Sequence, residues 1–120
     1  MKNDALSGTT LKKAGGRIAL SLFMARVGGD LQAIISGGDA HIGATALASG
    51  GKVSVMEAEG HREGEIAARA AAALATALGA RAAVSCGIHF DCITCAEIKW
   101  TEALADDLIE EAARFLRENS

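Results

Sequence analysis

Ser36-Gly37-Gly38-Asp39-Ala40-His41-Ile42-Gly43-Ala44 is the stretch around which the chain is organised, because it forms a bend between two apolar runs. Its glycines permit positive φ angles and close approach of the backbone. Such a bend can present backbone N–H groups, one carboxylate and one imidazole to a common point, which is more than a plain hairpin needs. A plain surface loop that carries a histidine has a similar composition and stays open as the alternative. We take this bend as the first candidate binding site.

Length and charge limit the classes of protein to consider. The chain has 120 residues and a formal net charge of -3, which predicts one domain with one core. Its 12 lysine and arginine residues are scattered, and aromatic residues make up only 3%, so nucleic acid is not an expected partner. No apolar run reaches the roughly 18 residues of a membrane helix, and the first residues lack the pattern of a signal peptide. We therefore expect a cytoplasmic protein without a membrane partner.

The periodicity of the apolar residues predicts the secondary structure. Alternation predicts five strands, at residues 16–27, 31–35, 42–48, 52–58 and 81–90. Apolar residues three and four apart predict two helices, at residues 63–78 and 95–117. Residues 1–13 show little periodicity, which predicts a flexible arm before a domain over residues 14–120. The element order ββββαβα predicts an α+β two-layer sandwich, in which two helices pack on one face of a mainly antiparallel sheet.

Two turn signals support these boundaries. Gly28-Gly29 fits a two-residue hairpin loop of the primed type between the first two strands. Thr94-Cys95-Ala96-Glu97 has the form of a capping box, in which a hydroxyl and a carboxylate satisfy backbone N–H groups at the start of a helix. The last helix is therefore expected to begin near Cys95.

The three histidines share a local setting. Each lies near a predicted strand end with an acidic residue close by: His41 with Asp39, His61 with Glu63, and His89 with Asp91. If the sheet brings these strand ends together, the imidazoles and carboxylates can hold a divalent metal or bind phosphate and carboxylate groups. Taken singly, each histidine is equally compatible with a structural or merely exposed role.

The three cysteines lie close together near the start of the last helix. The spacing Cys86-x2-His89-x2-Cys92-x2-Cys95 is similar to that of metal ligands, but strand alternation sends Cys86 and His89 to opposite faces, and a second ligand pair is missing. Cys92-Ile93-Thr94-Cys95 also has the spacing of a redox pair, although no thioredoxin-like βαβ unit precedes it. The usual role of such residues, as small buried hydrophobic side chains, is the one we expect.

Three blocks of sequence together resemble the signature of the LpdD-like family. They are Gly37-Gly38-Asp39-Ala40-His41-Ile42-Gly43-Ala44-Thr45-Ala46-Leu47-Ala48, Gly60-His61-Arg62-Glu63, and Gly87-Ile88-His89-Phe90-Asp91-Cys92-Ile93-Thr94 with Glu97-Ile98. Members of this family are small accessory subunits of UbiD-type hydroxyarylic acid decarboxylases, such as gallate decarboxylase, and are described as prenylated-flavin chaperones. Two family prolines are replaced here, by Ala40 and Cys95.

This resemblance implies a non-catalytic accessory or chaperone protein. Such a protein binds or delivers prenylated FMN for a UbiD-type decarboxylase large subunit, or aids the maturation of that subunit. The implied cofactor-binding residues are Gly37, Gly38, Asp39, His41, Gly43, His61, Glu63, His89 and Asp91. A divalent metal, if one is held, is expected on His41, His61 and His89. The glycine-rich bend can bind a phosphate through backbone N–H groups, whereas the shortage of aromatic residues leaves the flavin ring without an evident partner.

A fainter resemblance leads to an alternative function. Asp39-Ala40-His41, Glu59-Gly60-His61-Arg62-Glu63 and Gly87-Ile88-His89 are similar to stretches of HutP, an RNA-binding antiterminator that uses histidine and a divalent cation. This implies a metal- or small-ligand-dependent regulatory or RNA-binding module, although the acidic charge argues against RNA. For either function we expect a homo-oligomer, because two helices cannot cover a sheet that is apolar on both faces. The sequence contains no nucleophile-elbow or phosphate-loop motif, so no motif in it predicts an enzyme.

Overall fold

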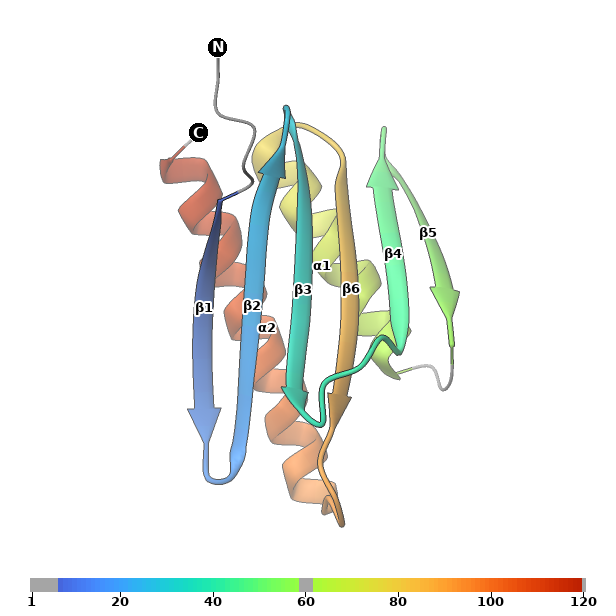
Figure 1. Cartoon of the computed structure of the whole chain (residues 1–120), viewed down its shortest axis with the longest axis vertical. Helices are drawn as coiled ribbons and strands as arrows, with labels where there is room; N and C mark the ends of the chain where they lie inside the picture. Colours follow the sequence, from blue (N-terminus) through green and yellow to red (C-terminus); the bar gives the residue numbers. More distant parts are fainter. Residues whose placement is uncertain (1–6, 59–61, 120) are drawn as a thin grey trace.

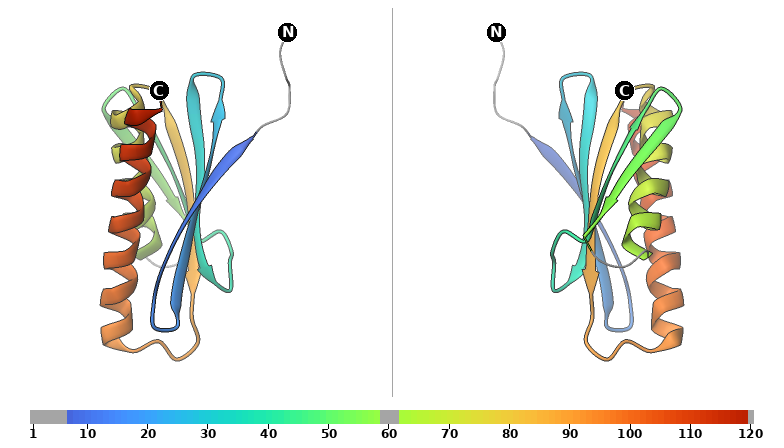
Figure 2. Two further views of the ribbon diagram at one scale, coloured as in Figure 1. Left: turned by 90° about the vertical axis from the view of Figure 1, so that its left-hand side faces the viewer. Right: turned by 90° about the vertical axis from the view of Figure 1, so that its right-hand side faces the viewer.

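The computed structural model describes residues 7–58 and 62–119, which form one sheet with two helices on one of its faces (Figures 1 and 2). The elements follow one another as β1 (Gly8–Gly15), β2 (Ile18–Val27), β3 (Asp30–Gly38), β4 (Ala44–Ser49), β5 (Lys52–Glu57), α1 (Arg62–Leu78), β6 (Ala82–His89) and α2 (Cys95–Glu118). The predicted α+β class with both helices on one face is confirmed.

The sheet has six strands in the order β1-β2-β3-β6-β4-β5, so the prediction of about five mainly antiparallel strands is right only in part. All neighbours are antiparallel except β3 and β6, which run parallel from the pair Leu31–Ala82 to the pair Gly38–His89. A parallel pair needs a long connection, and β4, β5 and α1 supply it here. Because β6 inserts between β3 and β4, the bend at residues 39–43 must cross the end of β6 (Figure 1).

The predicted flexible arm over residues 1–13 is wrong from Gly8 onward, because β1 begins there and pairs along its whole length with β2. Alternate side chains of β1 point toward the helices. Leu11 packs against the core, and Lys13 Nζ lies 3.3 Å from Glu111 Oε1 on α2. Alternation would place an apolar residue at position 13. A lysine stands there instead, and its side chain reaches a carboxylate on α2 at the edge of the sheet. Residues 1–6 lie outside the described residues.

The core lies between the sheet and the helices. β2 contributes Ile18, Leu20 and Leu22, all at most 1% exposed, and α1 and α2 contribute Ile66, Leu74 and Leu108. Around these, alanines on α1 allow the helix backbone to approach β4 and β6 closely. The predicted strand and helix ranges for these elements are therefore confirmed to within a few residues.

The other side of the sheet, here called the open face, is not covered by either helix (Figure 2). One row of paired positions runs across it from β2 to β5 through Phe23, Ile34, Ser85, Thr45 and Met56. Phe23, Ile34 and Met56 are 37%, 43% and 81% exposed. The open face therefore presents large apolar side chains to its surroundings. No helix within the described residues combines the length and hydrophobicity needed to cross a membrane.

Candidate functional site

The bend at residues 39–43 lies directly over the end of β6. A Cβ at Gly87 of β6 would overlap the carbonyl oxygen of His41, so only glycine permits this crossing. The bend is fixed at both ends by backbone hydrogen bonds. The Asp39 N–H donates to the His89 carbonyl (2.9 Å), which requires the positive φ of +66° at Gly38, and the Gly43 N–H donates to the Cys86 carbonyl (2.9 Å).

Glu63, in the first turn of α1, joins the bend to the sheet. Its Oε2 lies 3.1 Å from His41 Nε2 and accepts a hydrogen bond from the Ile88 N–H (2.7 Å). β4 pairs with β6 only as far as Cys86, so on that side of β6 the Ile88 N–H has no strand partner and donates to this carboxylate instead. Gly43 makes room for it, because a Cβ there would overlap the Glu63 carboxylate. The Glu63 side chain is only 14% exposed, so it is held in place on several sides.

The His41 ring is oriented by two acceptors. Its Nδ1 lies 3.0 Å from the carbonyl oxygen of Asp39, and its Nε2 faces Glu63. Both partners are hydrogen-bond acceptors, and the contact with Glu63 is an ion pair when the ring is protonated. These contacts hold His41 and Glu63 together at the end of β6.

Next to this ion pair is a recess of about 460 Å³ between the start of α1, the end of β6 and the start of α2. Its polar wall is formed by His41, Arg62, Glu63 and His89, and its apolar wall includes Ile88, Phe90, Ile93 and Ile98. The volume is within the roughly 300–1,000 Å³ typical of small-molecule sites. The recess can therefore take a ligand with an anionic group and an apolar body.

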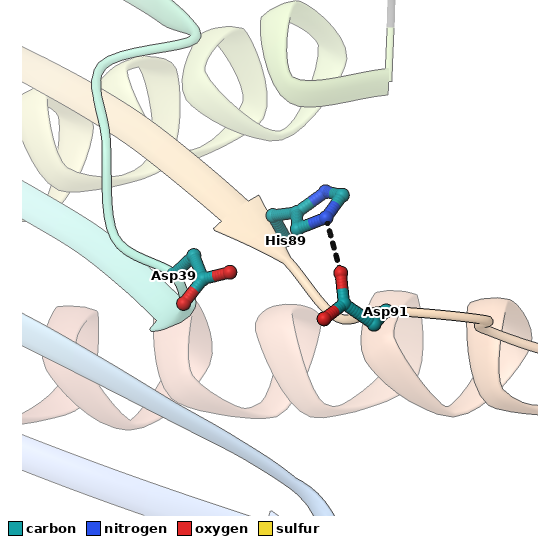
Figure 3. A group of neighbouring side chains, drawn as sticks. All are labelled: Asp39, His89 and Asp91. Atoms are coloured by element: carbon teal, nitrogen blue, oxygen red, sulfur yellow. Dashed lines mark hydrogen bonds and ion pairs between the residues drawn. The ribbon is translucent and has the colours of Figure 1, made fainter.

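The structure places the predicted site residues in three groups. His41, Glu63 and His89 line the recess. Asp39 and Asp91 lie beside His89, and all three of these side chains are exposed (Figure 3). The glycines have a different role, because Gly37, Gly38 and Gly43 leave space for close packing and do not line the recess. His61 lies outside the described residues, so the gathering of three histidines stays a prediction.

Arg17 fixes the loop that carries Asp91. This residue of the β1–β2 turn donates two hydrogen bonds to the Glu97 carboxylate (both 2.9 Å) and one to the Asp91 carbonyl (2.8 Å). Glu97 also accepts from the Thr94 N–H, which confirms the predicted capping box of α2. The hydrogen bonds from Arg17, and secondly from Thr94, lower the pKa of Glu97 below its ordinary value. The turn of the first hairpin thus positions the loop between β6 and α2, which lies more than 70 positions later in the sequence.

The cysteines differ in their surroundings. Cys86 is buried, and burial is the main cause that raises the pKa of its thiol to about 12. Cys92 and Cys95 are exposed, so the expected role of a small buried hydrophobic side chain is right for Cys86 and wrong for the other two. Cys92 and Cys95 are exposed because the chain leaves the sheet after His89 and runs over the surface to the start of α2.

A larger groove of about 840 Å³ lies at the opposite end of the sheet, between the Gly28-Gly29 and Gly50-Gly51 turns and the end of α1. Its lining is mostly glycine, alanine and serine. The charged pair in it, Asp30 and Arg81, is joined by an ion pair of 3.0 Å. This groove offers no cluster of imidazoles and carboxylates among the described residues, so the recess is the better candidate.

Several residues of the recess were not predicted from the sequence, among them Arg62 and Phe90. Arg62 stands between His61 and Glu63 in a block that was singled out, and Phe90 stands between His89 and Asp91. Their position beside candidate residues was the available signal. Arg62 Nε lies 3.5 Å from Glu102 Oε2, an exposed and therefore weak ion pair.

Comparison with known proteins gives a fold and a family. A search of curated proteins found no significant match. Among solved structures, one similar chain comes from a structure described as a novel chaperone complex for yeast 20S proteasome assembly. The TM-score is 0.57 at 8% identity, over 89% of this chain and 98% of that one, which shows a shared fold alone. A model of the prenylated flavin chaperone LpdD-like domain matches residues 14–117, and this chain therefore belongs to that family.

Proposed function

We propose that this chain is a non-catalytic accessory protein that binds prenylated FMN and delivers it to a UbiD-type aromatic acid decarboxylase, or aids the maturation of that enzyme. Family membership supports the flavin, and the recess beside His41 is the observation that carries the proposal. A cytoplasmic location, expected from the sequence, is part of this proposal.

The chemistry of the recess suits such a cofactor. A flavin mononucleotide has a phosphate and a large, mostly apolar ring system. Arg62 supplies positive charge for the phosphate, and Ile88, Phe90 and Ile98 supply an apolar wall for the ring. Phe90 is the aromatic neighbour that the composition did not lead us to expect. The carboxylates of Glu63 and Asp91 are each paired with a histidine, which reduces their repulsion of a phosphate.

The direct test is retention of flavin. The chain is mixed with prenylated FMN under anaerobic conditions, desalted, and its flavin absorbance is measured per chain. Arg62→Ala and Phe90→Ala are expected to weaken retention at least about tenfold, since each removes one wall of the recess. Arg69→Ala is the matched control, because Arg69 forms an ion pair with Asp106 outside the recess.

A second measurement separates binding from partnership. Co-purification with a UbiD-type large subunit tests the partner, and decarboxylation by the chain alone tests the non-catalytic role. The absence of both flavin retention and co-purification would overturn the proposal, and turnover by the isolated chain would overturn its non-catalytic part.

We also infer that two copies of the chain associate through the open face. At its centre the open-face positions of β2, β3, β6 and β4 are all uncharged, and include Phe23, Ile34 and Leu47. A second copy presents the same uncharged centre, so pairing of the two centres about a twofold axis buries no charge there. Ile34→Glu should give a monomer by sedimentation, while Trp100→Gln, an exposed aromatic on α2, should not. A monomeric parent chain would contradict this.

The HutP-like alternative, a metal- or small-ligand-dependent regulatory or RNA-binding module, stays a prediction. No feature of the described residues favours RNA over a flavin as the ligand of the recess.

A further inference from the structure

Asp39, His89 and Asp91 form a cluster at the edge of the recess (Figure 3). One potential ligand atom from each residue lies within 4.8 Å of the other two. All three side chains are exposed. Asp39 follows β3, whereas His89 ends β6 and Asp91 follows it, so the parallel pairing of these two strands is what brings the groups together.

The backbone beneath the cluster is fixed. The Asp39 N–H donates to the His89 carbonyl (2.9 Å), and Gly38 permits this approach because a Cβ there would overlap the same carbonyl. On the other side, Arg17 donates to the Asp91 carbonyl (2.8 Å). The three side chains therefore project from backbone that is anchored to the sheet and to the first hairpin, which lowers the entropic cost of gathering them on a ligand.

The charges of the cluster are unbalanced. Asp91 Oδ1 lies 3.0 Å from His89 Nε2, and within the described residues the Asp39 carboxylate has no ion pair or hydrogen bond of its own. Two carboxylates thus lie close to one imidazole, and only Asp91 contacts it. A divalent cation would bind both carboxylates and replace the proton between His89 and Asp91.

We propose that Asp39, His89 and Asp91 form a mononuclear site for a divalent first-row transition-metal ion. One imidazole nitrogen and two carboxylate oxygens are a borderline-to-hard ligand set, suited to Mn²⁺ or Zn²⁺. Three protein ligands leave coordination positions for water or for an anionic ligand. This set differs from the three histidines that the sequence suggested, which stay a prediction because His61 lies outside the described residues. The site stands on its own residues and does not require the flavin proposal.

Isothermal titration of the full chain with MnCl₂, after treatment with chelator, tests this site. We expect one Mn²⁺ per chain, and affinity at least about tenfold weaker in Asp39→Asn and in Asp91→Asn. Asp107→Asn, an exposed aspartate on α2, is the matched control and should bind as the parent does. Electron paramagnetic resonance of bound Mn²⁺ should lose its signal in the same two variants.

Two results would overturn the site: no saturable Mn²⁺ or Zn²⁺ binding by the parent chain, or binding that survives unchanged in Asp39→Asn and Asp91→Asn. Because the side chains are exposed, the variants should melt at the parent temperature, so lost binding will not reflect unfolding. Saturable Mn²⁺ binding without flavin retention would support the metal site and contradict the flavin-binding part of the proposed function, and the reverse result would do the opposite.

Discussion

The two ends of the sheet use glycine for different purposes. At the end with the 840 Å³ groove, a Cβ on Gly28, Gly29, Gly50 or Gly51 would meet nothing within 4 Å. At the recess end, a Cβ on Gly38, Gly43 or Gly87 would overlap a backbone carbonyl or the Glu63 carboxylate. Glycine serves turn geometry at one end and close packing at the other. The larger groove is therefore a gap between hairpins, whereas the smaller recess lies beside a fixed crossing of the chain.

Gly87→Ala should have the largest effect on stability. The added methyl group overlaps the His41 carbonyl, so the bend must lift from β6, at an expected cost of about 3 kcal/mol in the free energy of unfolding. Urea denaturation measures this. Gly29→Ala, at the opposite end and without a positive φ, should change stability by less than about 1 kcal/mol. Equal effects of the two substitutions would contradict the comparison.

Glu63→Gln should have an intermediate effect. The amide oxygen can still accept from the Ile88 N–H, but the ion pair with His41 is lost, so we expect a loss of about 1.5 kcal/mol. Glu65→Gln is the control, because Glu65 is exposed and lies in the same first turn of α1. If both variants lose the same stability, the effect belongs to the helix terminus and the fixed crossing does not depend on Glu63.

The Arg17–Glu97 pair should make a small, pH-dependent contribution. The folded pKa of Glu97 is lowered, mainly by the hydrogen bond from Arg17, so the contribution is present above the ordinary glutamate pKa. It is lost as the pH falls through the lowered folded pKa. The difference in stability between the parent and Arg17→Ala should therefore shrink on acidification, as measured by urea denaturation at a series of pH values. A difference that is constant with pH would contradict this cause.

Alkylation should distinguish the buried cysteine from the two exposed ones, and alkylation of the exposed ones should not measurably change the stability of the chain. With iodoacetamide at neutral pH, Cys92 and Cys95 should react in the folded chain, while Cys86 should not, because it is buried and its pKa is raised to about 12. Mass spectrometry should count two adducts in native buffer and three in denaturant. A third adduct in native buffer would show that the β6 end opens.

The sequence predicts well those elements whose local pattern agrees with their burial. β2 alternates Ile18, Leu20 and Leu22 toward the helices, and its boundary follows from Gly28-Gly29. β1 was missed because an edge strand tolerates lysines and threonines in place of a continuous apolar face. Local pattern also carries no information about pairing, so the insertion of β6 beside β3 could not be predicted.

The same limit applies to the site. His41, Glu63 and His89 were named from composition, but Glu63 was expected beside His61, and its contacts with His41 and the Ile88 N–H depend on the crossing of the bend over β6. Arg17 gave no signal, because its partner Glu97 is 80 positions away along the chain. Residue types reveal which chemistry is available, and the topology decides which groups meet.

Chemical-shift mapping of the ¹⁵N-labelled chain during titration with prenylated FMN tests the central claim most directly. The account predicts that shifts concentrate in residues 38–43, 62–66 and 87–98, around the recess beside His41. Shifts that concentrate instead around the Gly28-Gly29 and Gly50-Gly51 turns, or no shifts at saturating cofactor, would contradict it.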